Sequence, residues 1–428
     1  MSLQPLLESV LGTDLPVRVE AYDGSAIGPA DAPAKVVIRR PEAMHRILTG
    51  LGRELAFARA FVAGEIDIEG DIYAVLALRD HMGSMAVSPS LLREGAKAIG
   101  VNDLRSLAKL RPLPPPPEEV RLRGRRHSKE RDAKAISAHY DVSNEFYRMF
   151  LGPSLTYSCA VFEHEYDTLE QAQANKYELI CRKLDLQPGM RLLDIGCGWG
   201  GMVLHAARHH GVRAVGITIS VPQAELARKR VVDAGLADRV EIRVQDYRDV
   251  RDGPYDAISS IGMFEHVGYD HLSEYFGQIA RLLRPGGRLL NHGICRPGAP
   301  KHRGMAKNGF IQRYVFPDGE LVELGRVITA LQAHGLEVRH SEGLREHYAR
   351  TLRHWVANLE AHWDEAVAEV GEARARIWRL YMAGSALGFE SGQIQIHQVL
   401  AVQPDHGRSG MPLRPDFDRG GLAVTPVT

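Results

Sequence analysis

The sequence predicts an α/β protein in which helices cover both faces of a mainly parallel sheet, preceded by a smaller α+β domain. Three observations lead to this prediction. Segments typical of strands and of helices alternate from about residue 169 onwards. A glycine-rich turn follows the first of those strands, in the motif LLDIGCGWGG at residues 192–201. Four consecutive prolines at residues 114–117 separate the first part of the chain from the rest.

The composition is that of a folded protein with two domains. The chain has 428 residues, 44% hydrophobic and 25% charged, and Lys+Arg and Asp+Glu both total 53. This balance by itself says nothing about an acidic partner, and we expect no nucleic-acid partner for the reason given below for the basic segment. No apolar run approaches the roughly 20 residues that cross a bilayer, and we expect no signal peptide. The cysteines show no C-x-x-C spacing, which predicts no metal site and a cytoplasmic setting. They are Cys159, Cys181, Cys197 and Cys295.

The proline run divides the chain. Proline cannot sit inside a helix or a central strand, so we expect residues 111–134 to form a linker that is first proline-rich and then basic. Residues 1–110 form the smaller domain and residues 135–428 the larger. The smaller domain shows no catalytic constellation, and we interpret it as a docking domain. Its pattern predicts a short helix near the start, strands at 34–38 and 65–71, and helices at 54–63 and 72–78.

The segment from Arg121 to Lys134 is strongly basic. Lys or Arg occupies seven of its fourteen positions, against two acidic residues. Two interpretations stay open. The segment is a solvated surface, or it contacts anionic phospholipid headgroups, where each Lys or Arg residue contributes about 1 kcal/mol to binding. A nucleic-acid contact is less favoured because no aromatic side chains are interleaved with the charges.

The larger domain shows a regular succession of elements. Strands are predicted at 191–195, 214–219, 240–244, 257–261 and 288–292. Helices are predicted at 171–184, 200–210, 222–234 and 272–283, and two long helices follow at 356–370 and 373–389. Strands separated by helices in this way form parallel sheets.

The glycine-rich turn predicts a nucleoside site. Glycines let the backbone turn tightly and bring free N–H groups close to a ligand. A dinucleotide site would also need an acidic residue about 20 residues further on. The second strand instead ends in GITIS at 216–220, so NAD binding is poorly supported. The acid-x-Gly-x-Gly-x-Gly pattern at Asp194 resembles the first motif of class I S-adenosylmethionine methyltransferases, which have a Rossmann-like fold.

Further motifs resemble the cyclopropane fatty acid synthase family, which includes the mycolic acid cyclopropane synthases. The resemblance covers residues 136–398, nearly all of the larger domain. The matching motifs are HYDVSN (139–144), LTYSCA (155–160), the glycine motif, GITIS with Gln223, GMFEHVG (262–268), FI with YVFPDG (310–319), and the segment 381–389. The resemblance implies a class I methyltransferase domain with a helical lid.

The resemblance also implies a site. The family is understood to use a bound bicarbonate ion as a base. The residues that match its bicarbonate site are Cys159, Glu265, His292, Ile294 and Tyr381. For S-adenosylmethionine, Tyr157 and Ser158 match residues at the methionine portion. The remaining expected cofactor residues are Asp194, Gly196 and Gly198 in the turn, Thr218 and Gln223 near the ribose, and Gln245, Asp246 and Tyr247 near the adenine.

The expected reaction is methyl transfer to the double bond of an unsaturated acyl chain in a membrane phospholipid. Loss of a proton from the added methyl gives a cyclopropane. Loss from a neighbouring carbon gives a methylene group, which a reductase partner could saturate to a methyl branch. Departures from the family pattern, such as Glu145 and His397, leave the product open.

Two other function classes compete with this reading: a lipid-binding protein with a degenerate site, and a methyltransferase for a sterol or an amine. By resemblance we expect a homodimer, associated peripherally with the inner face of the cell membrane. The smaller domain is then a lipid-presenting or dimerisation domain.

Overall fold

The structure is a computed structural model that describes residues 2–50, 53–82, 111–120, 122, 126, 128–140, 142–298 and 309–418. Its chain divides into two compact units. The first comprises Met1–Arg121, Lys307–Val315 and Gly371–Gly384. The second comprises Leu122–Ala306, Phe316–Val370 and Ser385–Thr428.

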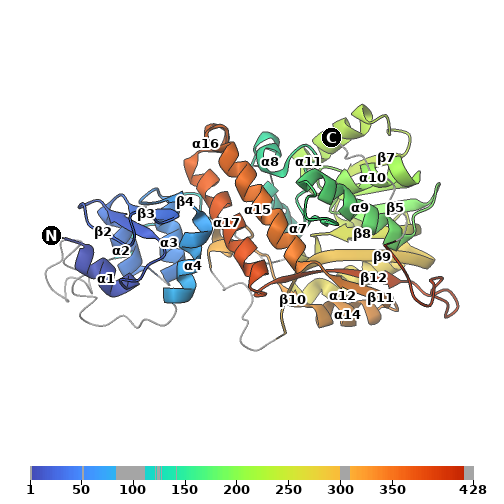
Figure 1. The fold of residues 1–428 in the computed structure, drawn as a ribbon. Coiled ribbons are helices and arrows are strands. Elements are labelled where there is room, and N and C mark those ends of the chain that lie inside the picture. Colours follow the sequence, from blue (N-terminus) through green and yellow to red (C-terminus); the bar gives the residue numbers. More distant parts are fainter. Residues whose placement is uncertain are drawn as a thin grey trace. The chain divides into compact units, whose positions relative to one another are not determined.

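The first unit is built on a four-stranded sheet with the order β2-β1-β3-β4 (Figure 1). Strand β3 (Ala34–Ile38) pairs in parallel with β1 (Arg18–Ala21) and antiparallel with β4 (Ile66–Gly70), and β2 (Ala26–Ile27) pairs antiparallel with β1. Residues of β3 alternate between buried and half-buried, as a strand with one covered face requires. The helices are α1 (Gln4–Leu11), α2 (Pro41–Thr49), α3 (Arg53–Val62), α4 (Ile72–Met82) and α13 (Phe310–Tyr314).

Part of helix α17 (Glu372–Glu390) belongs to this first unit. Strand β4 is an edge of the sheet, and an edge strand leaves backbone carbonyls without partners. The guanidinium of Arg376 donates to the carbonyl of Ile66 at 3.1 Å, and that of Arg379 donates to the carbonyl of Ile68 at 3.0 Å. The sequence boundaries at 110 and 135 do not anticipate this, because these bonds join residues about 300 positions apart.

The proline-rich segment 111–120 has no helix or strand, as the sequence predicts. It is nevertheless held within the first unit. Arg46 donates to the carbonyl of Pro114 at 2.7 Å. The buried carboxylate of Glu119 pairs with Arg59 at 2.7 Å and also with Arg313. Residues 111–120 therefore pack as part of a folded unit.

The second unit contains a sheet with the order β11-β12-β9-β8-β5-β6-β7, and β10 pairs with β9 at its end. The pairings of β5 to β10 are parallel, whereas β12 pairs antiparallel with both β9 and β11. The strands are β5 (Arg191–Ile195), β6 (Arg213–Thr218), β7 (Val240–Val244), β8 (Tyr255–Ile261), β9 (Leu283–Arg296), β10 (Val322–Glu323), β11 (Glu337–Gly343) and β12 (Gln395–Val402).

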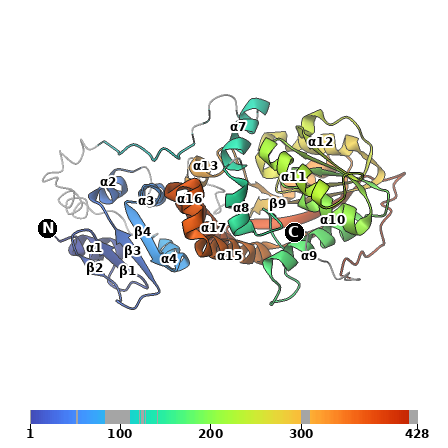
Figure 2. The ribbon, with the colours of Figure 1, turned by 90° about the horizontal axis from the view of Figure 1, so that it is seen from above.

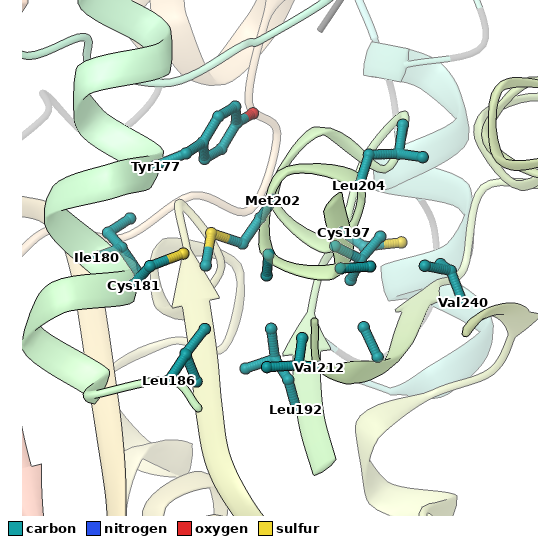
Figure 3. Close-up of a cluster of buried hydrophobic side chains, with 14 of the residues drawn as sticks. Tyr177, Ile180, Cys181, Leu186, Leu192, Cys197, Met202, Leu204, Val212 and Val240 are labelled. Carbon is teal, nitrogen blue, oxygen red and sulfur yellow. The ribbon is translucent and has the colours of Figure 1, made fainter. Parts of the chain in front are cut away.

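Helices cover both faces of this sheet. One face carries α9 (Leu169–Leu184), α10 (Gly201–His210) and α11 (Val221–Asp233), which spread side by side in Figure 2. The opposite face carries α12 (Leu272–Leu282) and α14 (Leu324–Gln332), seen below the sheet in Figure 1. Two apolar cores result, and Figure 3 shows the first, where Cys181 of α9 lies beside Met202 of α10. The other helices are α7 (Lys129–Tyr140), α8 (Asn144–Leu151), α15 (Arg345–Ala361) and α16 (Trp363–Val370).

The predicted α/β fold class is confirmed, and the differences lie in details. Strand β9 is longer than the predicted 288–292, and the antiparallel strands β11 and β12 were not predicted. The expected helix at 356–370 is divided at His362 into α15 and α16. Among the helices of the described residues, none is both long and apolar enough to cross a bilayer.

Candidate active site

All ten residues that the sequence assigns to the cofactor line one cavity of the second unit. They come from the segment before α9, from the first turn of α11 (Gln223), and from the carboxyl ends of β5, β6 and β7, which is where ligands bind in open α/β sheets. The ten are Tyr157, Ser158, Asp194, Gly196, Gly198, Thr218, Gln223, Gln245, Asp246 and Tyr247. Residues from separate elements of the chain thus line one cavity, as an adenosine-containing ligand requires.

The glycine turn between β5 and α10 has the geometry of a nucleoside cradle. Gly196, Gly198 and Gly200 have φ values of 78°, 52° and 84°, a region that side chains disfavour. The N–H groups of Gly196 and Cys197 both donate to the carbonyl of Ile217 on β6, at 2.9 Å each. The turn is therefore anchored to the neighbouring strand, and Gly196 and Gly198 line the cavity.

Asp194, at the end of β5, is buried, and its Oδ1 accepts a hydrogen bond from the Ser259 hydroxyl at 2.6 Å. Burial raises the pKa of Asp194 to about 6, although Ser259 and the charge of Lys176 act in the opposite direction. A carboxyl with this pKa is ionised at neutral pH and attracts a cationic group such as the amino group of S-adenosylmethionine.

Thr218 stands where nucleotide-binding enzymes carry a ribose-binding acid. Its hydroxyl donates to Oε1 of Gln223 at 2.9 Å and accepts from the N–H of Ser220 at 3.2 Å. The Thr218 proton is therefore already used to hold Gln223. This bond orients the Gln223 amide, which leaves its NH₂ group as a donor for a ribose hydroxyl.

The residues predicted for the adenine lie after β7. Asp246 caps the short helix η1 (Tyr247–Asp249), and its carboxylate pairs with Arg248 at 2.7 Å. Arg248 also reaches Asp132 of α7 at 3.0 Å. Both Asp132 and Arg248 line the cavity, although the sequence alone did not single them out.

The predicted base site lies where β8 and β9 run side by side. Glu265 sits on the short helix η2 (Phe264–His266), and its Oε1 accepts a hydrogen bond from the Ile294 N–H at 2.7 Å. The other oxygen, Oε2, is buried and has no partner among the described residues. Burial raises the pKa of Glu265 to about 7, despite the bond from Ile294. A buried carboxylate oxygen without a partner indicates a ligand that donates to it.

His292 precedes Ile294 by two positions on β9, so both residues face the same side of the sheet. Its ring is fully buried, and neither ring nitrogen has a partner among the described residues. Burial holds the pKa of His292 well below its ordinary value, and the charges of Lys176 and Lys183 add to this effect. The imidazole is therefore neutral, with one N–H to donate.

Cys159 and Tyr381 complete the predicted set. The thiol of Cys159 is buried and donates to the carbonyl of Ala160 at 3.2 Å. Burial raises its pKa far above the ordinary value, so the thiol is protonated and is no nucleophile. Tyr381 lies on α17, in the stretch that belongs to the first unit. Its proposed role at the anion stays a prediction.

One face of α9 was missed by the sequence reasoning. Gln173, Lys176 and Tyr177 follow the helical spacing i, i+3, i+4, and all three contact the segment Thr156–Ser158. Gln173 donates to the carbonyl of Ser158 at 2.9 Å, and the hydroxyls of Tyr177 and Thr156 lie 3.0 Å apart. The helix pattern could have indicated these residues, because they are polar positions on a helix face that is otherwise apolar.

A second cluster offers metal ligands. Cys181 of α9 and His205 and His210 of α10 bring ligand atoms within 4.8 Å of one another. Nε2 of each histidine lies within hydrogen-bond distance of Oε2 of Glu178, at 3.3 and 3.0 Å. Glu178 thus satisfies both rings without an ion. This cluster could not be predicted from the sequence, because its members come from two helices and lack a spacing motif.

Comparisons with known proteins agree with this geometry. The family model described as mycolic acid cyclopropane synthetase matches residues 127–399. The chain belongs to this family. A solved mycolic acid cyclopropane synthase, in complex with SAH and CTAB, has a TM-score of 0.60 and 36% identity, over 63% of this chain and 98% of that one. As a member of the family, the chain is an S-adenosylmethionine-dependent methyltransferase.

Two relatives match both units of the chain. A probable fatty acid methyltransferase of Mycobacterium tuberculosis is 47% identical over 428 residues, which is 97% of this chain and 98% of that protein. A tuberculostearic acid methyltransferase of the same organism is 36% identical, covering 91% of this chain and 88% of that protein.

Proposed function

We propose that the chain methylates the double bond of an unsaturated fatty acyl chain in a membrane phospholipid and closes the product to a cyclopropane. The observation that carries this proposal is that two groups of the predicted base site, Glu265 Oε2 and the His292 ring, are buried and have no partner among the described residues. Methyl transfer to an amine or a hydroxyl group needs no separate ligand bound beside these two groups. Methyl transfer to an alkene does need one, to act as a base, because a proton must afterwards be removed from carbon.

The chemistry explains these requirements. S-adenosylmethionine supplies an electrophilic methyl group. An alkene is a weak nucleophile, and positive charge develops on its carbon chain as the new bond forms. The site must exclude water from that cation while providing a base. The burial of Cys159, Glu265 and His292 provides the dry surroundings.

These residues fit a bicarbonate ion. A bicarbonate ion bound there would supply the base. The Glu265 carboxylate can accept from a hydroxyl, and neutral His292 can donate to an oxygen. The N–H of Ile294 holds Glu265 in place, which fixes the direction of its free oxygen. Since Glu265 must be ionised to accept such a bond, activity requires a pH near or above its pKa of about 7.

A second product is supported by a particular observation. The relative named tuberculostearic acid methyltransferase matches 91% of this chain. The same cation that closes to a ring gives a methylene group when a neighbouring carbon loses the proton, and a reductase partner would then give a methyl branch. The two outcomes differ only in which proton the base removes.

Proton NMR of the product lipid tests the proposal. Vesicles of an unsaturated phospholipid are incubated with the enzyme and S-adenosylmethionine, and the acyl chains are extracted. We expect cyclopropane ring protons far upfield, and none with Glu265→Gln. Exocyclic methylene protons in their place would contradict ring closure while supporting the second product. No acyl methylation at all would overturn both.

A further inference from the structure

Lys176 is a fully buried lysine in the middle of α9. Its Nζ donates to Oγ of Ser158 at 2.8 Å and lies 3.9 Å from the centroid of the Tyr177 ring. No carboxylate oxygen lies within 4.0 Å of it among the described residues. Buried ammonium groups are costly unless they are paired. The position therefore favours a bound anion, because no described residue supplies one.

Lys183 shows the contrast on the same helix. It is also fully buried, but its Nζ pairs with Glu342 and donates to Oε1 of Gln398 at 2.7 Å. Lys183 is thus satisfied by the folded chain. Lys176 differs only in lacking such a partner, and the single hydroxyl that it contacts lines the cofactor cavity.

The direction of the hydrogen bond decides what Ser158 can do. Burial lowers the pKa of Lys176 to about 7, and an anion bound nearby would raise it again. The charged lysine has no acceptor, so in that state the Ser158 oxygen is the acceptor and its own proton is free. The backbone of Ser158 cannot turn away, because Gln173 holds its carbonyl at 2.9 Å. Ser158 therefore presents a donor to the cavity, backed by a positive charge. The anionic group of S-adenosylmethionine is its carboxylate.

We propose that Lys176 is a positioning residue for the cofactor, which holds the carboxylate of S-adenosylmethionine through the hydroxyl of Ser158. The titratable groups that face Lys176 from other elements fit this role. Asp194 on β5 is the charged one, whereas Cys159 and His292, which also interact with Lys176, are both neutral and do not compete with an anion. Asp194 suits the amino group of the cofactor, and Lys176 suits the carboxylate. The inference concerns the cofactor end of the site and holds for either acyl product.

Affinity for two ligands that differ only in the carboxylate tests the inference. S-adenosylmethionine and its decarboxylated form are titrated into the full chain by calorimetry. We expect Lys176→Met to weaken binding of S-adenosylmethionine about tenfold or more, because a charge-assisted bond is lost. Binding of the decarboxylated form should change little. Equal weakening for both ligands, or no weakening for either, would overturn the proposal.

The route through Ser158 is tested by a double-variant cycle. Ser158→Ala should weaken S-adenosylmethionine binding as Lys176→Met does, and the double variant should be no weaker than either single one. Additive losses would show that Lys176 does not act through Ser158. No lipid is present, so these results are independent of whether the acyl chain is the substrate.

Stability provides the matched control. Lys176→Met removes a buried charge without a partner, so the ligand-free protein should unfold at a higher temperature. Lys183→Met breaks a pair and should lower the unfolding temperature, without distinguishing between the two ligands. If Lys176→Met instead destabilises the protein as Lys183→Met does, Lys176 is a structural residue and the proposal fails.

Discussion

At the scale of single residues, the account depends on polar groups that the fold buries without satisfying. Glu265, His292 and Lys176 are each buried, and each has an unused hydrogen-bonding group or charge. Such groups lower stability and are retained where they bind or react. The Glu178 cluster shows the opposite case, because its histidines and carboxylate satisfy one another.

Glu265→Gln should abolish most turnover and leave cofactor affinity unchanged. The amide is a weaker acceptor for the bicarbonate hydroxyl, so the bound base would be lost, and general-base contributions are commonly about 10²–10⁴-fold in rate. The cofactor cavity is lined by other residues. Turnover on unsaturated vesicles and calorimetric binding of S-adenosylmethionine measure the two effects. A parallel loss of both would contradict the role of Glu265.

The same substitution should change how stability depends on pH. The pKa of Glu265 is about 7 in the folded protein, whereas an ordinary glutamate, as in the unfolded chain, has a pKa of 4.5. As the pH rises, the unfolded chain therefore loses this proton at a lower pH than the folded protein does. The contribution of Glu265 to the free energy of unfolding is therefore fully present below pH 4.5. It is lost as the pH rises to about 7, by about 1.4 kcal/mol per pH unit. Unfolding in bicarbonate-free buffer should show this loss for the wild type but not for Glu265→Gln. Parallel curves would refute the raised pKa.

At the scale of elements, the base site depends on the contact between η2 and β9. The Cβ of an alanine at position 293 would lie 1.9 Å from Cε1 of Phe264, so only glycine lets η2 approach the strand. This approach brings Glu265 to the N–H of Ile294.

Gly293→Ala should therefore lower both the free energy of unfolding, by about 1–3 kcal/mol, and the turnover. Gly325→Ala is the matched control. It lies within α14 with no atom within 4 Å of the added carbon, and helical alanine is stabilising by up to about 1 kcal/mol. Chemical denaturation and turnover measure both. Normal stability and activity in Gly293→Ala would show that the contact with Phe264 is dispensable.

The elements also show how far the sequence could be interpreted. The turn from β5 into α10 carries its signal locally, in glycines that need positive φ. The strand β12 does not, because its pairing with β9 depends on residues about 100 positions away. Lys176 was missed for a similar reason. A lysine on a helix usually faces solvent, and only the packing of α9 shows that this one is buried.

At the scale of the whole molecule, the basic segment 121–134 is the candidate surface through which the enzyme would reach a lipid substrate. Several basic side chains of the segment 121–134 form ion pairs within the protein. Arg131 pairs with Asp318 at 2.6 Å, and Lys129 pairs with Asp249 at 2.7 Å. Lys134 is exposed. Arg123 and Arg125 lie outside the described residues. We propose that the basic side chains of Arg123, Arg125 and Lys134 contact anionic headgroups at the membrane.

Replacing Arg123, Arg125 and Lys134 by glutamine should weaken binding to anionic vesicles more at low salt than at high salt, because salt screens exposed charges. Arg131→Gln is the control. It should lower stability, through Asp318, with a smaller effect on vesicle binding. Cosedimentation at two salt concentrations measures this. Binding that is indifferent to salt would mean that the segment is only solvated surface.

The central claim, methyl transfer to an acyl double bond, has one direct test. The purified chain is incubated with S-adenosylmethionine labelled with ¹³C in its methyl group. Parallel reactions contain vesicles of unsaturated or fully saturated phospholipid, or soluble amines. We expect labelled acyl chains, heavier by one CH₂ unit that carries the ¹³C, only from the unsaturated vesicles. Label in the amines and none in the unsaturated chains would contradict the account.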